Sequence, residues 1–330
     1  MPRLAITMGD PGGVGPEVLI KSLARPGVAA ILQPLIFGNM QILRETASRL
    51  NLTVQFQAVS SAVRLDAGQD PGVVSVFDPS GIAAEEFSVG TIAKANGRAS
   101  YAWIVAAAQA ALQGEVDGIC TAPIAKEALF EAGYTVPGHT ELLASQCGRE
   151  VVRMMLAGGG LRVVLQTIHV SLARVPQLLK TDEIITSLEI IAEFGPRAGI
   201  DQPRIAVCGL NPHASEGGHF GNEEETIITP AIEAARQKGI DVQGPFPADT
   251  IFHRVLQGDF DFVLAMYHDQ GLIPVKTLDF NGGVNVTLGL PLVRTSPDHG
   301  TAFNIAGKGI ADEGSMVAAL KYAASLAKAR

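Results

Sequence analysis

Three histidines each follow a short apolar run, and this repeated arrangement is the strongest chemical feature of the sequence. They are His169 after residues 163–166, His213 after residues 204–208 and His268 after residues 262–266. Such runs are typical of buried strands, and open α/β sheets bind ligands at the carboxyl ends of their strands. A single histidine in this position is more often a hydrogen-bonded structural residue than a metal ligand. Three of them favour a divalent metal site of the zinc type, which collects imidazoles from separate elements.

Three polar side chains further along the chain are candidates for binding an anion. Lys276, Asn285 and Arg294 are spaced through Gly-rich turns and can converge as hydrogen-bond donors. The alternative for each charged residue is a surface ion pair. Since the chain carries a net charge of −8, an anionic substrate requires a local cationic pocket of this kind.

Two further motifs have both a structural and a functional interpretation. In the segment 137–142, Thr140 caps a helix and leaves His139 free, or the two residues contact a ligand. The glutamates 223–225 are acids suited to the first turn of a helix, and we interpret them as partners of the helix dipole rather than as catalysts.

Alternating strands and helices must position these residues. Strand-like runs occur at 4–8, 34–37, 53–56, 73–77 and 118–120, with helical stretches between them, and 154–156 with 163–166 reads as a hairpin. A strand, a glycine loop and a helix start follow one another at residues 4–17, which is either an anion-binding turn or a tight turn before Pro16. The loop matches neither GxGxxG nor GxxxxGK[ST].

Composition restricts the class of protein. The chain has 330 residues, of which 47% are hydrophobic and 18% charged, as expected for a compact α/β protein of one or two domains. Its negative charge argues against binding to nucleic acid or to an anionic membrane. The three cysteines show no CxxC spacing, and we find no signal peptide or membrane span, so we expect a cytoplasmic protein.

Seven motifs in collinear order extend over essentially the whole chain. They are GDPGGVGPE, GHTELLA, TIHVSL, CGLNPHASEGGHFG, GPFPADT, YHDQGLIPVK and GGVNVTLGLPLVRTSPDHGT. In these motifs the sequence resembles the 4-hydroxythreonine-4-phosphate dehydrogenase family of the vitamin B6 pathway. Related members of that family oxidise threonate or erythronate 4-phosphate, or aromatic cis-dihydrodiols.

The resemblance implies a three-layer α/β/α fold similar to isocitrate and isopropylmalate dehydrogenases. It implies two domains with a cleft between them, in a homodimer whose active sites use residues of both subunits. We expect a discontinuous first domain on the cofactor side, residues 1–138 plus 297–330. The second domain, residues 139–296, would carry the metal, the substrate and the dimer interface.

The resemblance also assigns roles to residues. It implies that His169, His213 and His268 bind one divalent metal, with His268 from the partner subunit or the reverse arrangement. Its substrate-binding positions fall on five residues of this chain: His139, Thr140, Lys276, Asn285 and Arg294. The segment DHGTAFNIAGKGIAD is similar to the cofactor segment of β-decarboxylating dehydrogenases, which implies cofactor contacts at His299, Gly300, Thr301 and Asn304.

The expected reaction is oxidation of the C3 alcohol of 4-phosphooxy-L-threonine by NAD or NADP, followed by decarboxylation, with zinc, magnesium or cobalt as the metal. Asp249 is the first candidate for the general base and Asp269 the second, although either can instead orient a histidine. One alternative is a D-threonate or D-erythronate 4-phosphate dehydrogenase, and a dihydrodiol dehydrogenase is a weaker one. A protein that only binds metal and phosphoester represents a different class.

Overall fold

The computed structural model describes residues 1–62 and 72–328, which form two compact units. The first unit contains Met1–Val151 and Leu290–Lys328, and the second contains Val152–Gly289. The chain therefore leaves the first unit and returns to it, as a discontinuous first domain requires. The sequence suggested divisions at 138/139 and 296/297, whereas the units divide at 151/152 and 289/290. His139, Thr140 and Arg294 consequently belong to the first unit.

The first unit is built on a parallel sheet. Its strands are β1 (Arg3–Thr7), β2 (Gln33–Phe37), β3 (Gln55–Ala58), β4 (Val73–Phe77), β5 (Gly118–Thr121) and β12 (Arg294–Pro297). Their order is β3-β4-β2-β1-β5-β12, and every neighbouring pair is parallel. Strands β1 and β5 are buried along their whole length, as the continuous apolar runs of a parallel sheet with two covered faces predict.

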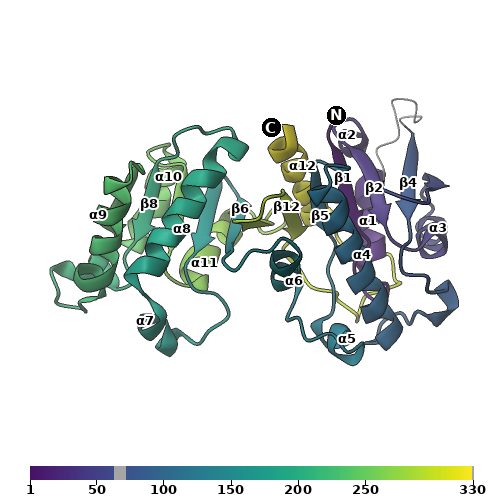
Figure 1. The fold of residues 1–330 in the computed structure, drawn as a ribbon, viewed down its shortest axis with the longest axis horizontal. Coiled ribbons are helices and arrows are strands. Elements are labelled where there is room, and N and C mark those ends of the chain that lie inside the picture. Colours follow the sequence, from purple (N-terminus) through teal and green to yellow (C-terminus); the bar gives the residue numbers. More distant parts are fainter. Residues whose placement is uncertain (63–71, 329–330) are drawn as a thin grey trace. The chain divides into compact units, whose positions relative to one another are not determined.

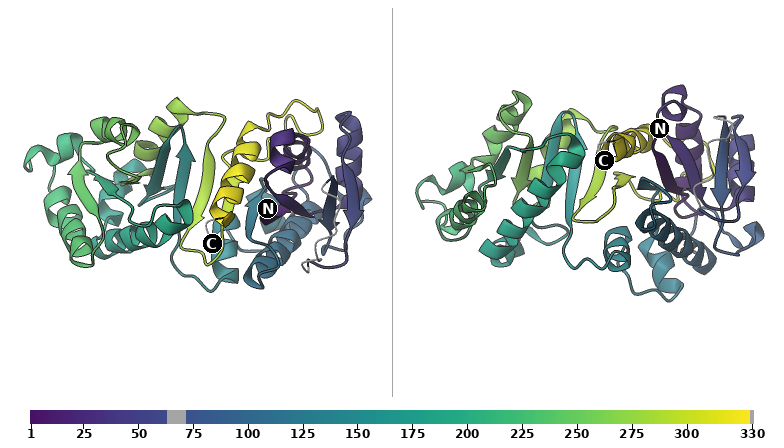
Figure 2. Two further views of the ribbon diagram at one scale, coloured as in Figure 1. Left: turned by 90° about the horizontal axis from the view of Figure 1, so that it is seen from above. Right: turned by 45° about the horizontal axis from the view of Figure 1, so that its top comes forward.

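Helices cover both faces of this sheet. They are α1 (Gly15–Leu23), α2 (Pro26–Ala29), α3 (Met40–Arg49), α4 (Lys94–Leu112), α5 (Lys126–Glu131), α6 (His139–Gln146) and α12 (Gly314–Lys328). The long helix α4 packs on β1 and β5 together with α5 and α6, while α1, α3 and α12 group on the other face (Figures 1 and 2). Trp103 on α4 is completely buried. The described residues contain no helix that is both long and apolar enough to cross a membrane.

The second unit has a mixed sheet. Its strands are β6 (Arg153–Gly158), β7 (Leu161–Leu165), β8 (Ile205–Cys208), β9 (Val242–Phe246), β10 (Phe262–Ala265) and β11 (Val284–Leu288), in the order β11-β6-β7-β10-β8-β9. Strands β6 and β7 form the expected antiparallel hairpin, which turns at Gly159 and Gly160. The remaining run of strands, β7, β10, β8 and β9, is parallel.

Helices again cover both faces of the sheet. They are α7 (Val175–Leu178), α8 (Thr181–Phe194), α9 (Thr229–Gln237), α10 (Ala248–Leu256) and α11 (His268–Leu278). Helices α8 and α9 pack on one face, and α10 and α11 on the other. Residues of α10 and α11, such as Ile251 and Val275, form one buried cluster with residues of β7, β8 and β10. Both units therefore have the expected three-layer α/β/α architecture.

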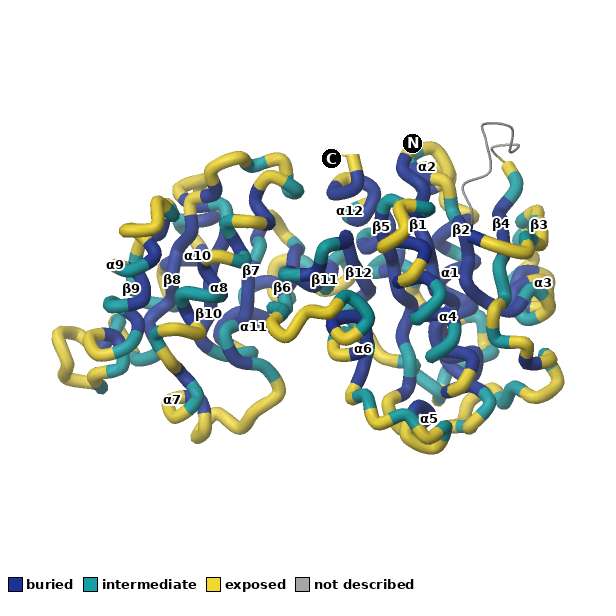
Figure 3. The backbone as a smooth tube through the Cα atoms, in the orientation of Figure 1, coloured by how far each residue is buried: buried dark blue, intermediate teal, exposed yellow. Residues whose placement is uncertain are grey.

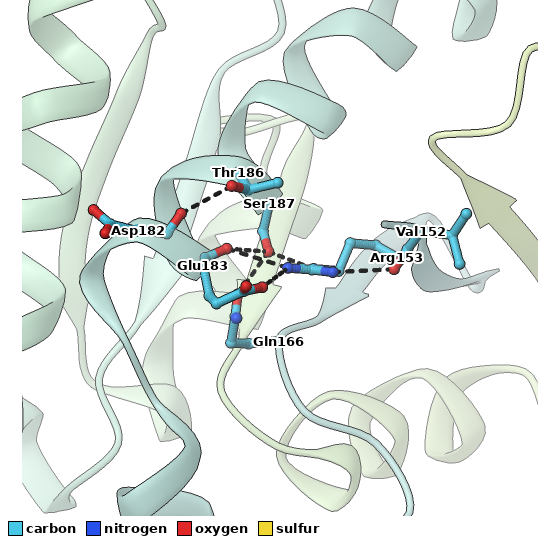
Figure 4. A network of polar contacts seen from close by, with 7 residues as sticks. All are labelled: Val152, Arg153, Gln166, Asp182, Glu183, Thr186 and Ser187. Carbon is cyan, nitrogen blue, oxygen red and sulfur yellow. Dashed lines mark hydrogen bonds and ion pairs between the residues drawn. The ribbon is translucent and has the colours of Figure 1, made fainter. Parts of the chain in front are cut away.

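A partly buried polar network attaches α8 to the hairpin of the second unit (Figure 4). Arg153 on β6 donates hydrogen bonds to the hydroxyl of Ser187 (2.6 Å) and to the carboxylate of Glu183 (2.7 Å). Ser187 in turn donates to the side-chain oxygen of Gln166, just beyond the end of β7, at 2.6 Å. The network fixes the point where the chain leaves β7 toward His169.

Candidate functional site

The three histidines follow the carboxyl ends of three neighbouring parallel strands. Strand β7 ends at Leu165, β10 at Ala265 and β8 at Cys208, and the order in the sheet is β7-β10-β8 (Figure 3). Because parallel strands end at one edge of a sheet, all three histidine loops leave from the same edge, as the sequence predicted. The next strand, β9, adds a carboxylate at this edge, since Asp249 follows it in the first turn of α10.

His169 and His268 lie beside each other. Their ring centroids are 5.7 Å apart, and both side chains line a hollow together with Thr167, Tyr267 and Asp269. His268 is 37% exposed, so a ligand in the hollow can reach it. Two imidazoles in this arrangement can supply two of the ligands of a divalent metal ion.

Asp269 holds the His268 ring in place. Its carboxylate lies 2.7 Å from Nδ1 of His268, which leaves Nε2 of the ring for another ligand. A carboxylate on the far nitrogen is the usual partner of a metal-binding histidine, where it fixes the tautomer and the ring orientation. Asp269 itself is 72% exposed. Its contact with His268 favours the orienting role over the role of general base.

Two of the three histidines have unusual backbone conformations. His169 has φ of +48° and His213 has φ of +54°, both in the left-handed region. The three residues after His213, Ala214 to Glu216, also have positive φ. Non-glycine residues in this region are strained by about 1–3 kcal/mol each and cluster at functional sites, because only a surrounding structure that fixes them keeps them there.

Two side chains to which the sequence assigned no role in the site support the histidine loops. Glu224 is buried, and its carboxylate accepts hydrogen bonds from the backbone N–H groups of Leu210 and Asn211, just before His213. It is thus more than the helix-dipole partner we expected. Gln270 is also buried and bonds the backbone on either side of it, at Met266 and at Gly209. Glu224 also begins a π-helical turn, and such turns often occur at functional sites.

The donor set of the second unit fits a divalent metal in its chemistry. Neutral imidazoles from three loops, one of them backed by a carboxylate, are ligands that zinc and cobalt accept, whereas magnesium prefers oxygen. Among residues 1–62 and 72–328 of one chain, however, no three His, Cys, Asp or Glu side chains lie close enough together to hold an ion. His169 and His268 are brought together, and His213 does not complete the set within the same chain.

A second set of predicted residues gathers in the first unit, around Arg294. Its guanidinium is buried and donates to the hydroxyl of Thr121 on the neighbouring strand β5 at 2.8 Å. Burial lowers the pKa of Arg294 to about 10, partly offset by Cys120 and Glu141, so the side chain is still charged at neutral pH. Desolvation, helped by the charge of Arg294, keeps the pKa of His139 well below its ordinary value. The pair offers a cation beside a neutral imidazole.

The helix that carries His139 and Thr140 does not begin as the capping interpretation suggested. Helix α6 starts at His139, and the residue before it, Gly138, occupies the cap position without a side-chain cap. Thr140 is therefore inside the helix, and the capping interpretation was wrong. The Nε2 atom of His139 is shielded from solvent and has no hydrogen-bond partner within the described part of the chain. Such an atom is suited to meet a polar group of a ligand.

Lys276 and Asn285 lie on regular elements of the second unit rather than in Gly-rich turns. Lys276 belongs to the last turn of α11, and its ammonium group lies 5.9 Å from the centre of the Phe280 ring. Asn285 is on β11, opposite Leu156 of β6. Both side chains are partly accessible. Arg294, the third predicted anion ligand, is in the first unit, so the structure does not group these three within one unit.

The predicted cofactor segment lies against the glycine loop of the first unit. The carbonyl of Thr301 accepts a hydrogen bond from the backbone N–H of Val14 at 2.9 Å, at the start of α1. A Cβ atom on Gly13 would lie 2.8 Å from the Thr301 carbonyl oxygen, so only glycine allows this approach. His299, Gly300 and Asn304 are exposed beside this contact and remain available to a ligand.

Known proteins resemble the chain over almost its whole length. The family model for the pyridoxal phosphate biosynthetic protein PdxA matches residues 30–323. A 4-hydroxythreonine-4-phosphate dehydrogenase of Beijerinckia indica is 49% identical, over 98% of this chain and 94% of its own. A D-threonate 4-phosphate dehydrogenase of Cupriavidus necator is 46% identical, over 100% and 98% of the two chains. The crystal structure of the 4-hydroxythreonine-4-phosphate dehydrogenase of Klebsiella pneumoniae superimposes with a TM-score of 0.92 at 40% identity, covering 99% and 98%.

Proposed function

The chain belongs to the PdxA family of pyridoxal phosphate biosynthetic proteins, and we propose that it is a metal-dependent NAD(P) dehydrogenase acting on 4-phosphooxy-L-threonine. The substrate alcohol at C3 loses a proton to the protein and a hydride to NAD or NADP. The product, 2-amino-3-oxo-4-phosphooxybutanoate, is a β-keto acid and decarboxylates to 3-amino-2-oxopropyl phosphate.

One observation carries this proposal: three neighbouring parallel strands each deliver a histidine to one edge of a sheet, and the rings of His169 and His268 are 5.7 Å apart. Together with His213 these are the residues that would hold the metal. A divalent metal bound there would supply a positive charge that lowers the pKa of the C3 alcohol and, once the alcohol has been oxidised, polarises the C3 carbonyl group for the loss of carbon dioxide.

Each of the predicted substrate ligands would supply a different kind of polar contact. The buried guanidinium of Arg294 offers bidentate donors to a phosphate or carboxylate, whereas Lys276 offers a point charge and Asn285 an amide. His139 stays neutral at pH 7, so it binds as a hydrogen-bond partner and not as a second cation. Thr140, in the first turn of the same helix, adds a hydroxyl.

A base is needed for the proton of the C3 alcohol, and we assign it to Asp249. The side chain is exposed at the same sheet edge as the histidines, in the first turn of α10. Asp269 is engaged with His268 and would orient that ring. The cofactor would contact His299, Gly300, Thr301 and Asn304, with the nicotinamide nucleotide beside the glycine loop.

A second copy of the chain completes the site in this proposal. Two imidazoles meet within one chain, so the third ligand would come from a homodimer partner. Helix α11 and the residues after it provide a suitable surface, because Ile273, Leu278 and Phe280 are 63%, 49% and 77% exposed. Large apolar side chains exposed close together commonly mark a protein interface. We place the protein in the cytoplasm, where its three free cysteines stay reduced.

The second candidate function is the oxidation of D-threonate or D-erythronate 4-phosphate. It is favoured by relatives of similar identity that bear the name D-threonate 4-phosphate dehydrogenase, in Cupriavidus necator and in Salmonella typhimurium at 43% identity. Such a substrate uses the same metal and anion ligands but lacks the amine at C2.

The test measures nicotinamide reduction with 4-phosphooxy-L-threonine, D-threonate 4-phosphate and D-erythronate 4-phosphate as substrates. We expect turnover of the first to exceed that of the others, and to disappear after chelation or in His213→Ala. Faster turnover of a sugar-acid phosphate supports the second candidate. Activity that survives both chelation and His213→Ala rules out the metal-dependent mechanism, and tight ligand binding without any nicotinamide reduction identifies a binding protein instead.

A further inference from the structure

The backbone just before His213 is held by two buried side chains from different elements. Glu224, at the start of the π-helical turn Glu224–Ile228, accepts hydrogen bonds at Oε1 from the N–H groups of Leu210 (2.8 Å) and Asn211 (2.7 Å). Its other oxygen, Oε2, accepts from the side-chain amide of Asn211 at 2.8 Å. A single carboxylate thus fixes two consecutive peptide groups and one side chain.

Gln270 ties the same segment to the loop that carries His268. Its side-chain oxygen accepts from the backbone N–H of Met266 at 2.6 Å, and its side-chain amide donates to the carbonyl of Gly209 at 2.8 Å. An acceptor at one end and a donor at the other leave only one orientation of the amide that satisfies both partners. The hydroxyl of Thr167 extends the chain to the His169 loop by donating to the carbonyl of Met266 at 2.8 Å.

These bonds connect the ends of β7, β10 and β8, which carry the three histidines. The connection matters most at His213, where Ala214, Ser215 and Glu216 continue the left-handed backbone. A strained turn of this kind persists only when its surroundings fix it. The contact is also close: a Cβ atom on Gly209 would lie 3.0 Å from Oε1 of Glu224.

We propose that Glu224 and Gln270 are positioning residues for the metal site, which hold the His213 loop in its binding conformation before an ion arrives. This inference rests on the proposed metal dependence. Neither side chain would touch the metal, the substrate or the cofactor. They keep the His213 loop ordered in the metal-free protein, so that metal binding does not have to supply the free energy of ordering it. Loss of either side chain should therefore lower the affinity for the metal.

The test is a titration of the full-length, metal-free protein with Co²⁺, in competition with a chromophoric chelator. Glu224→Ala and Gln270→Leu should each weaken Co²⁺ binding roughly 10–100-fold, the range typical of residues that support metal ligands. Glu224→Gln, which keeps one acceptor oxygen, should fall between Glu224→Ala and the wild type. Matched controls are Glu225→Ala, at the exposed residue next to Glu224, and Gln237→Leu, at an exposed glutamine on α9; both should bind Co²⁺ as the wild type does.

Two further measurements separate positioning from general stabilisation. The thermal unfolding midpoint of each metal-free variant shows whether it is folded, and the visible absorption of bound Co²⁺ reports the coordination geometry. A folded Glu224→Gln or Gln270→Leu protein with unchanged affinity and an unchanged spectrum overturns the inference and leaves the proposed function intact. Failure of the wild type to bind Co²⁺, or unweakened binding by His213→Ala, removes the proposed metal site itself and the inference with it.

Discussion

Arg294 and Thr121 form a buried hydrogen bond of 2.8 Å between the guanidinium Nη2 and the threonine hydroxyl, across the neighbouring parallel strands β12 and β5. Both side chains are inaccessible to solvent apart from 4% of Arg294. A guanidinium attached to a strand in this way has few orientations left. If Arg294 binds the substrate anion, Thr121 sets the direction in which its remaining N–H groups point.

Removing the hydroxyl of Thr121 should therefore weaken substrate binding. Thr121→Val keeps the shape of the side chain, and we expect KM for the phosphorylated substrate to rise about tenfold, which corresponds to about 1.4 kcal/mol, with little change in kcat. Thr121→Ser retains the hydroxyl and serves as the control. Equal kinetics of the valine and serine variants contradict the orienting role.

Arg294 itself should discriminate phosphorylated from unphosphorylated substrates. Arg294→Ala removes a buried bidentate donor, and we expect kcat/KM for 4-phosphooxy-L-threonine to fall by about two to three orders of magnitude, or roughly 3–4 kcal/mol. The loss for 4-hydroxythreonine should be much smaller. The exposed Arg98→Ala on α4 is the matched control. Equal losses for both substrates would mean that Arg294 binds the substrate carboxylate, or only stabilises the fold, and does not bind the phosphate.

The histidine loops show which parts of such a site are readable from sequence. Continuous apolar runs predicted β7, β8 and β10, because a strand buried on both faces has little choice of residue type. The three histidines were then visible by their position after those runs. Gln270 was not, because its partner Gly209 lies 61 positions away in the sequence. Contacts of that kind depend on the order of the strands in the sheet, and local sequence patterns do not predict that order.

Tertiary packing also overruled two local patterns. Lys276 was expected among Gly-rich turns, yet it lies in α11, and this helix also contains Gly271 and Pro274. Leu272 and Val275 recur at helical spacing and are buried, and this packing outweighs the propensities of proline and glycine. Glu224 resembled its neighbours in a run of three acids. Only the fold distinguishes the one glutamate that is buried and bonded to the backbone.

His139 should make the stability of the protein depend on pH in a defined direction. Its folded-state pKa is depressed, mainly by desolvation, so the unfolded chain takes up a proton near pH 6.5 while the folded protein does not. The free energy of unfolding is therefore not reduced by this group above pH 6.5, and it falls as the pH drops from 6.5 toward the folded-state pKa. Between pH 7 and pH 5, we expect the free energy of unfolding of the wild type to fall by about 1–2 kcal/mol more than that of His139→Gln, as measured by urea unfolding. A parallel pH dependence of the two proteins contradicts the depressed pKa.

Asp269 and Asp249 should have separable effects, although both lie at the sheet edge that carries the histidines. Asp269→Ala frees the His268 ring, so Co²⁺ affinity should fall roughly 10–100-fold. Asp249→Ala should leave Co²⁺ affinity unchanged and lower kcat about 10²–10⁴-fold, as expected for loss of a general base. The two measurements together test the assignment. The opposite result would be an unchanged kcat in Asp249→Ala together with loss of turnover in Asp269→Ala at saturating metal. It would identify Asp269 as the general base in place of Asp249.

Asp10 in the glycine loop gives the opposite pH dependence from His139. The residue is completely buried, and its Oδ1 accepts hydrogen bonds from the backbone N–H of Gly12 (2.8 Å) and the side-chain amide of Asn96 (3.0 Å). The other oxygen, Oδ2, has no hydrogen-bond partner within residues 1–62 and 72–328. Desolvation raises the pKa of this carboxyl group above its ordinary value, against the lowering effect of hydrogen bonds from Gly12, Asn96 and the backbone of Ala125.

A raised pKa in the folded state means that the unfolded chain loses its proton first as the pH rises. The Asp10 carboxyl group should therefore destabilise the folded protein progressively from about pH 4 up to its folded-state pKa, above which the effect is constant. Asp10→Asn cannot ionise, so the stability of the wild type relative to this variant should decline over that interval. Urea unfolding of both proteins from pH 4 to pH 8 measures the difference, with the exposed Asp201→Asn as a control that shows no such decline. A constant difference between wild type and Asp10→Asn means that burial does not shift the pKa of this group, and that the orphaned oxygen finds a partner in solution.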